Sequence, residues 1–324
     1  MTIEAEHIMI QDTPKSTALT VMKNHGALFN VTYPPARFWQ EGELGWVDEY
    51  PMPLVDKGKH KDTCQYKWVV REDTGQVLGM HSGTYPENPN YEYLGDLAER
   101  MFPESTTGCT VIDGGERIML KQDIGETIDL GGGDTIKPQV LWISSFNGTW
   151  ATQVLDSISR WFCSNQIITG DALFKVKHTL NHNYTLEARA WVLEESMKRS
   201  KTFGAMARIL KDQAFTDEQF KELTKQLVPD PQPLPGEKEV ALRRWTSCHK
   251  KRDHMVTTWQ SECEQWDVKN RWLAYNAIQG TEQHHINTGY SDTDDGIAKA
   301  TVKLVNGRTP LATKAMTLLT SSNV

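Results

Sequence analysis

The sequence predicts a mixed α+β fold in which an antiparallel, strand-rich front portion is followed by a mostly helical rear. In the front portion, short runs of β-branched and aromatic residues alternate with turn sequences. From about residue 185 onward, long stretches of good helix formers replace them. The chain has 324 residues, 38% hydrophobic and 24% charged, which is typical of a globular protein with a sizeable core.

The chain begins with segments of weak pattern. Residues 1–24 are polar and lack a sustained period, which predicts an arm or a short helix. Residues 36–46 predict a short helix that ends at glycine. Residues 46–56 predict an extended edge segment, because Pro51 and Pro53 cannot donate hydrogen bonds to a central strand ladder.

A β-hairpin followed by a helix is the clearest local prediction in the front portion. Residues 65–71 and 76–85 are rich in strand formers and flank the turn sequence Glu72-Asp73-Thr74-Gly75. Residues 91–102 predict a helix, because their apolar side chains recur at helical spacing. Together with the segments before them, these elements form a unit of helix, three strands and helix.

The same order of elements is expected to recur over the next stretch. Residues 109–112 and 117–122 predict a second hairpin. Residues 139–145 and 149–155 flank Asn147-Gly148, the strongest hairpin dipeptide, and residues 158–163 are expected to begin a helix. The strand-rich domain is therefore placed at residues 25–184. The order of its elements suggests two similar units, although their sequence identity is too low to define a repeat.

The rear region, residues 185–324, predicts long helices. Residues 185–210 and 238–279 contain mostly helix formers, and Thr216 with Gln219 predicts a capping box. Residues 229–236 contain four prolines and predict a stiff linker. Four tryptophans, Trp245, Trp259, Trp266 and Trp272, are expected to pack as an aromatic stripe in a helical core; the alternative is a platform on which bases stack.

Charge is distributed unevenly along the chain. Its net charge is -7, but residues 1–150 hold 12 basic and 22 acidic residues, a net charge of -10. Residues 198–252 hold 13 basic and 7 acidic residues, a net charge of +6. The asymmetry indicates two surfaces with different partners; the alternative is that solvated helices simply carry lysine and arginine.

Several classes of protein are disfavoured by the sequence. No apolar run is long enough to cross a membrane, and the start is acidic and unlike a secretory signal. Five dilute cysteines without a CxxC pair predict a reduced, cytoplasmic chain. Gly131-Gly132-Gly133-Asp134 is followed by Ile136-Lys137-Pro138 and a strand, where a phosphate loop is followed by a helix, and so predicts a tight loop.

No cofactor, metal site or catalytic activity is predicted. The cysteines and histidines of residues 248–263 are spaced too widely along a helix to converge on one ion, and no GxSxG, HExxH or Walker motif occurs. An enzyme remains the third hypothesis, with a site assembled around Cys163, Asp171 and His178.

A stretch in which cations alternate with rings is the candidate binding site. Such alternation suits a protein that follows a phosphate backbone and stacks on bases. The alternative is an edge strand whose lysines prevent pairing with other chains, followed by a solvated helix. The predicted phosphate contacts are Arg160, Lys175, Lys177, His178, Arg189, Lys198, Arg199 and Lys201, and the predicted stacking residues are Tyr184 and Trp191.

An ordered set of short motifs resembles a family of phage and plasmid-like proteins of unknown function. The motifs are residues 69–79 (VVREDTGQVLG) with Tyr85, Phe146-Asn147-Gly148, residues 160–165 (RWFCSN), Lys177-His178-Thr179, and residues 272–277 (WLAYNA) with Gln283-His284. They span roughly residues 35–290. Asn147 stands where the family usually has Asp, and Ser164 separates Cys163 from Asn165. The resemblance implies a phage, prophage or plasmid context without supplying a reaction.

The order of elements in residues 36–102 is also similar to the core of single-strand annealing recombinases. That likeness implies rings or filaments that hold nucleic acid in a basic groove beside a sheet. The leading hypothesis is therefore a non-catalytic DNA-metabolism protein that binds single-stranded DNA and forms a homo-oligomer. A stronger form of this hypothesis is that the protein also anneals single strands. The alternative is a protein–protein module whose acidic front half docks onto a host factor.

Overall fold

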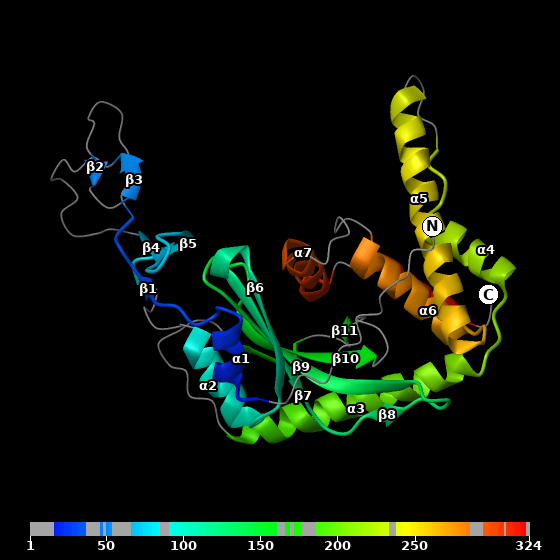
Figure 1. Cartoon of the computed structure of the whole chain (residues 1–324), viewed down its shortest axis with the longest axis horizontal. Coiled ribbons are helices and arrows are strands. Elements are labelled where there is room, and N and C mark those ends of the chain that lie inside the picture. Colours follow the sequence, from blue (N-terminus) through cyan, green and yellow to red (C-terminus); the bar gives the residue numbers. More distant parts are fainter. Residues whose placement is uncertain are drawn as a thin grey trace.

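The computed structural model describes residues 16–36, 46–47, 50–53, 66–84, 91–160, 166–168, 172–176, 186–232, 238–285, 294–307 and 309–321. It has the predicted α+β fold, with antiparallel sheets in the front half and mostly helices in the rear (Figure 1). The strands are β1 (Val31–Thr32), β2 (Trp46–Val47), β3 (Tyr50–Pro53), β4 (Tyr66–Arg71), β5 (Val77–Ser82), β6 (Thr106–Ile112), β7 (Arg117–Asp123), β8 (Ile128–Asp129), β9 (Thr135–Ser145), β10 (Thr152–Arg160), β11 (Gln166–Ile168) and β12 (Phe174–Val176). The helices are α1 (Ala18–Asn24), α2 (Tyr91–Met101), α3 (Leu186–Lys211), α4 (Asp217–Leu227), α5 (Lys238–Trp266), α6 (Arg271–Gly280), α7 (Asp294–Val305) and α8 (Pro310–Thr320), with a 3-10 turn η1 (Asp113–Gly115) and a π-helical turn η2 (Thr281–His285).

The three predicted hairpins are confirmed. Strands β4 and β5, β6 and β7, and β9 and β10 pair antiparallel. Strands β6 to β12 form one sheet of seven strands, ordered β11-β10-β9-β7-β6, with β12 paired to β10 and β8 paired to β9. Strand β1 joins β4 and β5 in a separate sheet of three strands, and β2 and β3 pair with each other.

The predicted repeat of strands followed by a helix does not form. The second and third hairpins share the seven-stranded sheet, whereas the first lies in the three-stranded sheet. Residues Ile158 to Arg160, expected to begin a helix, are the end of β10 and pair with Ile136 to Pro138 of β9. Residues 161–165 lie outside the described part. Pairing across the sheet therefore overrides a local pattern that was ambiguous between helix and strand.

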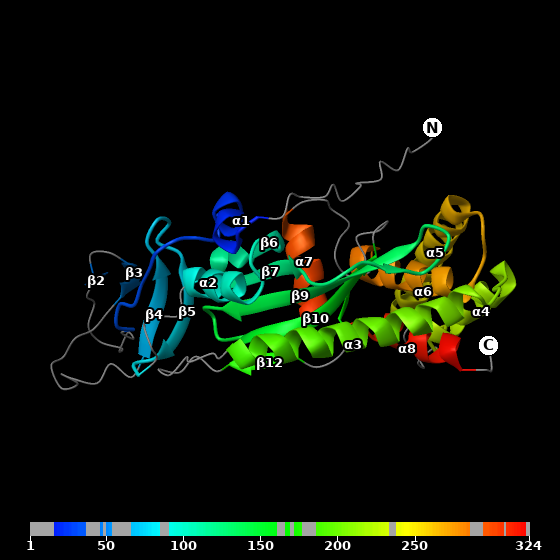
Figure 2. The same cartoon turned by 90° about the horizontal axis from the view of Figure 1, so that it is seen from below.

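The two faces of the large sheet pack against different helices (Figure 2). On one side, which we call the α3 face, Ile136 and Ile158 pack with Phe203 and Ala207 of α3. Farther along the same face, Trp142 packs in a cluster with residues of α1 and α2. We call the opposite side the α7 face, because its apolar residues cluster with side chains of α7.

Of the arm or short helix predicted for residues 1–24, the structure shows the short helix, α1, and this helix belongs to the core. Residues 1–15 lie outside the described part, but Ala18 and Met22 of α1 are fully buried beside α2. The domain boundary expected near residue 185 does not separate two cores. Residues of β9 and β10, before it, and residues of α3 to α6 and α8, after it, belong to one hydrophobic cluster.

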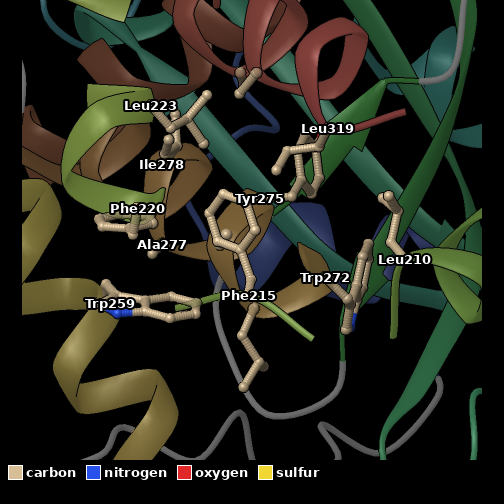
Figure 3. Packing of buried hydrophobic residues seen from close by; sticks show 14 of the residues in the cluster. Leu210, Phe215, Phe220, Leu223, Trp259, Trp272, Tyr275, Ala277, Ile278 and Leu319 are labelled. Atoms are coloured by element: carbon tan, nitrogen blue, oxygen red, sulfur yellow. The ribbon is translucent and has the colours of Figure 1, made fainter. Parts of the chain in front are cut away.

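The rear helices close over an aromatic centre (Figure 3). The ring of Trp259 stacks on Phe220 with 4.7 Å between centroids and meets Phe215 edge-on at 6.3 Å. Trp259 and Trp272 are buried as predicted. The predicted helix over residues 238–279 is two helices, α5 and α6, because Asp267 has a φ of 49° and the side chain of Asn270 caps α6. The predicted capping box of Thr216 and Gln219 is present at α4.

A buried carboxyl group lies between α3 and the sheet. Asp156 of β10 is fully buried and accepts a hydrogen bond from the hydroxyl of Ser196 of α3. Burial raises the pKa of Asp156 to about 6, although Ser196 and Arg199 act in the opposite direction. The folded protein therefore holds this proton more tightly than the unfolded chain does.

We expect Asp156→Asn to stabilise the protein at neutral pH. Below the unfolded pKa near 3.8, both states of Asp156 are protonated. As the pH rises to about 6, the unfolded chain ionises first and stability is lost; above that pH the loss is complete. The gain for the variant should be on the order of 1–3 kcal/mol near pH 7.5 and should shrink towards pH 4. Urea unfolding at both pH values tests this, and a gain of equal size at both would contradict it.

Candidate nucleic-acid interface

The structure describes the side chains of six of the ten predicted binding residues, and these six lie on three different elements. Three of them, Lys177, His178 and Tyr184, lie outside the described residues. Arg189 lies in α3, and its side chain is likewise outside the described part. The others, Arg160, Lys175, Trp191, Lys198, Arg199 and Lys201, occupy the end of β10, the strand β12, and α3.

Arg160 is a buried structural residue rather than a surface cation. Its side chain is 1% exposed and forms a bidentate pair with Asp134, at 2.9 Å and 3.0 Å. A third nitrogen lies 2.7 Å from the carboxylate of Glu262 on α5. The guanidinium also lies over the ring of Trp272. Because its donors are directed at carboxylates in the interior, Arg160 is corrected from a phosphate contact to a core ion pair.

The remaining predicted residues form only a weak cationic surface. Lys175 is exposed on β12, whose only partner among the described strands is β10. Trp191 is exposed at 49%, and Lys198 and Lys201 are exposed on the same helix. However, Glu195 pairs with Lys198 at 3.8 Å and with Arg199 at 3.0 Å. Residues 191–201 thus carry a net charge of only +1.

A denser basic surface lies at the N-terminal end of α5. Residues 242–252 (LRRWTSCHKKR) contain five basic residues and no acidic one. Residues 242–247 are all exposed, so nearly two helical turns are solvated all round. We call residues 242–251 the basic segment; in Figure 1 it projects from the body of the protein at the far end of α5 from α6.

Trp245 is the exception to the predicted buried aromatic stripe. It is 47% exposed, and its ring lies 3.7 Å, between centroids, from that of His249 one turn later. The neighbouring Leu242 is 64% exposed. An exposed indole between Arg244 and Lys250 gives the segment both an aromatic surface and positive charge. The run of basic residues was visible in the sequence, but exposure of Trp245 was not.

The basic segment is fixed at its base. Asp230, three residues after the end of α4, pairs with Arg252 and lies 3.3 Å from His249. One turn further, Met255 and Trp259 are buried in the aromatic core. The segment is therefore a continuation of an anchored helix, so its side chains are held on a rigid element.

The described residues offer little for nucleophilic or metal chemistry. Burial raises the pKa of Cys109 and of Cys263 to about 12, so neither thiol is activated. Within the described part, no three His, Cys, Asp or Glu side chains are grouped to hold a metal. The three residues of the enzyme hypothesis, Cys163, Asp171 and His178, lie outside the described part. No described helix is long and apolar enough to span a bilayer.

These features define an α+β protein with a large antiparallel sheet and a projecting basic helix. The chain belongs to the family described as "Domain of unknown function (DUF932)", whose model matches residues 77–306, more than half of the sequence. That match runs from β5 past the end of α7 and includes the basic segment. No curated protein and no solved structure matches the chain. The expected membership in a family of unknown function is thus confirmed in this general form.

We expect Arg160→Met to destabilise the fold without a specific effect on binding. The change removes the guanidinium from the carboxylates of Asp134 and Glu262 and leaves only the ammonium of Lys211, 3.9 Å from Asp134, beside them. Removing one partner of a buried ion pair typically costs about 3–5 kcal/mol. Adding Asp134→Asn should recover part of the loss, because the buried charge is then removed. Urea unfolding measures both, with Lys198→Met as a surface control expected to change stability by about 0.5 kcal/mol or less. Unchanged stability of Arg160→Met would contradict the core assignment.

Proposed function

We propose that this protein binds single-stranded nucleic acid through the basic segment of α5 and acts without catalysis in phage or mobile-element DNA metabolism. The observation that carries the proposal is the exposure of residues 242–247 around the whole helix, next to a further run of cations. Side chains on a helix that is solvated on every side do not contribute to packing. The choice of arginine, lysine and tryptophan in this segment is therefore better explained by binding of a partner. Arginine, lysine and tryptophan at such a place suit a phosphate-bearing partner.

The spacing of the cations supports contact with several phosphates. Arg243 and Lys250 lie two turns apart on one face of the helix, and Arg244 and Lys251 follow on the adjacent face. The helix from residue 243 to residue 251 is about 12 Å long. Phosphates of one strand follow one another at about 3.4 Å along a duplex axis, so this length covers several of them.

The exposed ring of Trp245 supports a preference for single strands. The faces of a base are available to an indole only when the base is not stacked in a duplex. The contact with His249 holds the indole against the helix. A ring held in this way loses little side-chain entropy when a base stacks on it.

Annealing is the stronger version of the proposal. It brings two strands together, and a homo-oligomer would present more than one basic segment. A cytoplasmic location in a host that carries a phage or plasmid belongs to the same proposal. The exposed set on α3, with Trp191, Lys198 and Lys201, is the competing surface on the same chain.

A pair of matched charge reversals distinguishes the two surfaces. Arg243→Glu with Lys250→Glu, and Lys198→Glu with Lys201→Glu, change the net charge equally. We expect the α5 pair to weaken binding of a labelled single strand in fluorescence anisotropy and to reduce the slope of log affinity against log salt by about 1.4, that is about 0.7 for each lost phosphate contact. The α3 pair should leave the slope nearly unchanged.

Two results would contradict the proposal. Equal effects of the two pairs would show that binding depends on overall charge rather than on the basic segment. No binding of the unmodified protein at low salt would remove nucleic acid as the partner. A host protein retained in a pull-down after nuclease treatment would then favour the alternative of a protein–protein module, approached through the acidic front half.

We expect Trp245→Ala to weaken binding of single strands by about 5- to 150-fold, because base–aromatic stacking contributes about 1–3 kcal/mol per base. Trp245→Phe should retain most of the affinity, since it keeps a flat ring. Trp191→Ala is the control, with an equally exposed tryptophan on α3. Affinity for duplex should change little. Equal losses for Trp245→Ala and Trp191→Ala would count against stacking at α5.

A further inference from the structure

The π-helical turn η2 contacts both α5 and α7 and shows which side of each helix is turned towards it. At its start, the hydroxyl of Thr281 donates to the hydroxyl of Thr258 on α5 at 3.1 Å. One residue later, the carbonyl of Glu282 accepts a hydrogen bond from the ammonium of Lys303 on α7. Thr258 and Lys303 therefore mark the η2-facing sides of α5 and α7.

Cations of the basic segment continue along the η2-facing side of α5. Lys251 precedes Thr258 by seven residues and Arg244 precedes it by fourteen, about two and about four helical turns. Because these intervals are close to whole turns, all three residues lie on nearly the same side of the helix. Arg244 is exposed, and Lys251 is partly exposed. Two of the four cations of the basic segment are thus on the side that faces η2.

Lysines also lie on the η2-facing side of α7. Val302 and Val305 pack in the cluster on the α7 face of the sheet, whereas Lys303 is directed at η2. Lys299 precedes Lys303 by one turn on the same side of α7 and is exposed. The two aspartates of this helix lie in its first turn, more than two turns from Lys303.

The ammonium groups of Lys251 and Lys303 are close enough to repel each other. Burial lowers the pKa of Lys303, the charge of Glu282 acts in the opposite direction, and the charge of Lys251 lowers the pKa further. Both oxygens of the Glu282 carboxylate accept hydrogen bonds from backbone N–H groups of α8, those of Leu311 and Ala312, at 3.1 Å and 2.8 Å. One carboxylate beside two ammonium groups leaves a net positive charge, which favours an anion.

We propose that Lys251 and Lys303 together bind phosphates of the nucleic-acid strand, so that a strand on the basic segment continues from α5 onto α7. Arg244 contacts the strand before this point, and Lys299 contacts it after. The inference rests on the proposed function, because the phosphates belong to the same strand. Cations on two helices fix the direction of the strand, which a single helix solvated on all sides does not define.

Acylation of the whole protein tests the approach of the two lysines without nucleic acid. An amine-reactive ester modifies the neutral amine, so its rate at Lys303 across a pH series, read by peptide mass spectrometry, follows loss of the proton. Lys251→Met should move this profile to higher pH, because it removes a repelling charge. Lys250→Met removes a cation from the adjacent side of α5 and should move the profile less. No shift, or equal shifts for both variants, would overturn the proposal.

Strand binding tests the contact itself. In the unmodified protein, a single strand should slow acylation of Lys303 and leave Lys198 of α3 unaffected. In fluorescence anisotropy, Lys303→Met should weaken binding about 5-fold at 0.1 M salt and lower the slope of log affinity against log salt by about 0.7, the value for one phosphate contact. Lys198→Met should change neither quantity. Lys299→Met should act in the same direction but less strongly, because Lys299 is nearer the aspartates of the first turn.

The outcomes distinguish this inference from the proposed function. Protection of Lys303 together with the lower slope of Lys303→Met supports the path from α5 onto α7. If reversing Arg243 and Lys250 weakens binding, but the strand neither protects Lys303 nor loses affinity in Lys303→Met, the strand is held by α5 alone and only the inference is overturned. If the unmodified protein binds no strand at low salt, the proposed function is overturned and the inference with it.

Discussion

The guanidinium of Arg160 joins the sheet to the helical half of the protein. It is held by Asp134, just before β9, and by Glu262 of α5, and the indole of Trp272 on α6 donates to the same Asp134 carboxylate at 2.9 Å. Four segments distant in sequence thus share one buried ionic centre. Such a centre contributes orientation more than net stability, because desolvation offsets much of the attraction. Its geometry fixes the direction of α5 against the sheet, and hence where the basic segment projects.

Much of the local structure followed from the sequence because its causes are local. A turn sequence between two runs of strand formers specifies a hairpin, and Thr216 with Gln219 specifies a helix start. The repeat failed where the outcome depended on distant pairing. The sequence of residues 158–160 is compatible with a helix or a strand, and these residues form a strand because they pair with β9. Sheet membership of the first hairpin, apart from the others, is equally invisible in a linear pattern.

The candidate site was harder to predict for a related reason. Arg160 and Lys250 are both cations among aromatic residues, and only their surroundings make one a core residue and the other a surface residue. Trp245 and Trp259 are fourteen residues apart, which places them on nearly the same side of a helix. Helical periodicity gives the side on which a residue lies but not whether another element covers it. Elements pack beside Trp259, while the described part of the chain leaves Trp245 exposed.

The acidic front half of the chain is compatible with the proposed binding of nucleic acid at the basic segment, because charge acts over short distances in salt. At physiological ionic strength, interactions between exposed charges are largely screened beyond about 8 Å. The basic segment projects away from the front sheets in Figure 1, so a strand bound along it would meet four cations before it met the acidic surface. If the basic segment instead packed against the acidic front half, the negative charges there would offset its positive electrostatic potential. The proposed binding of a polyanion by a negatively charged protein therefore depends on the length of α5, about 43 Å for its 29 residues, and on its anchoring at Asp230, Glu262 and Trp259.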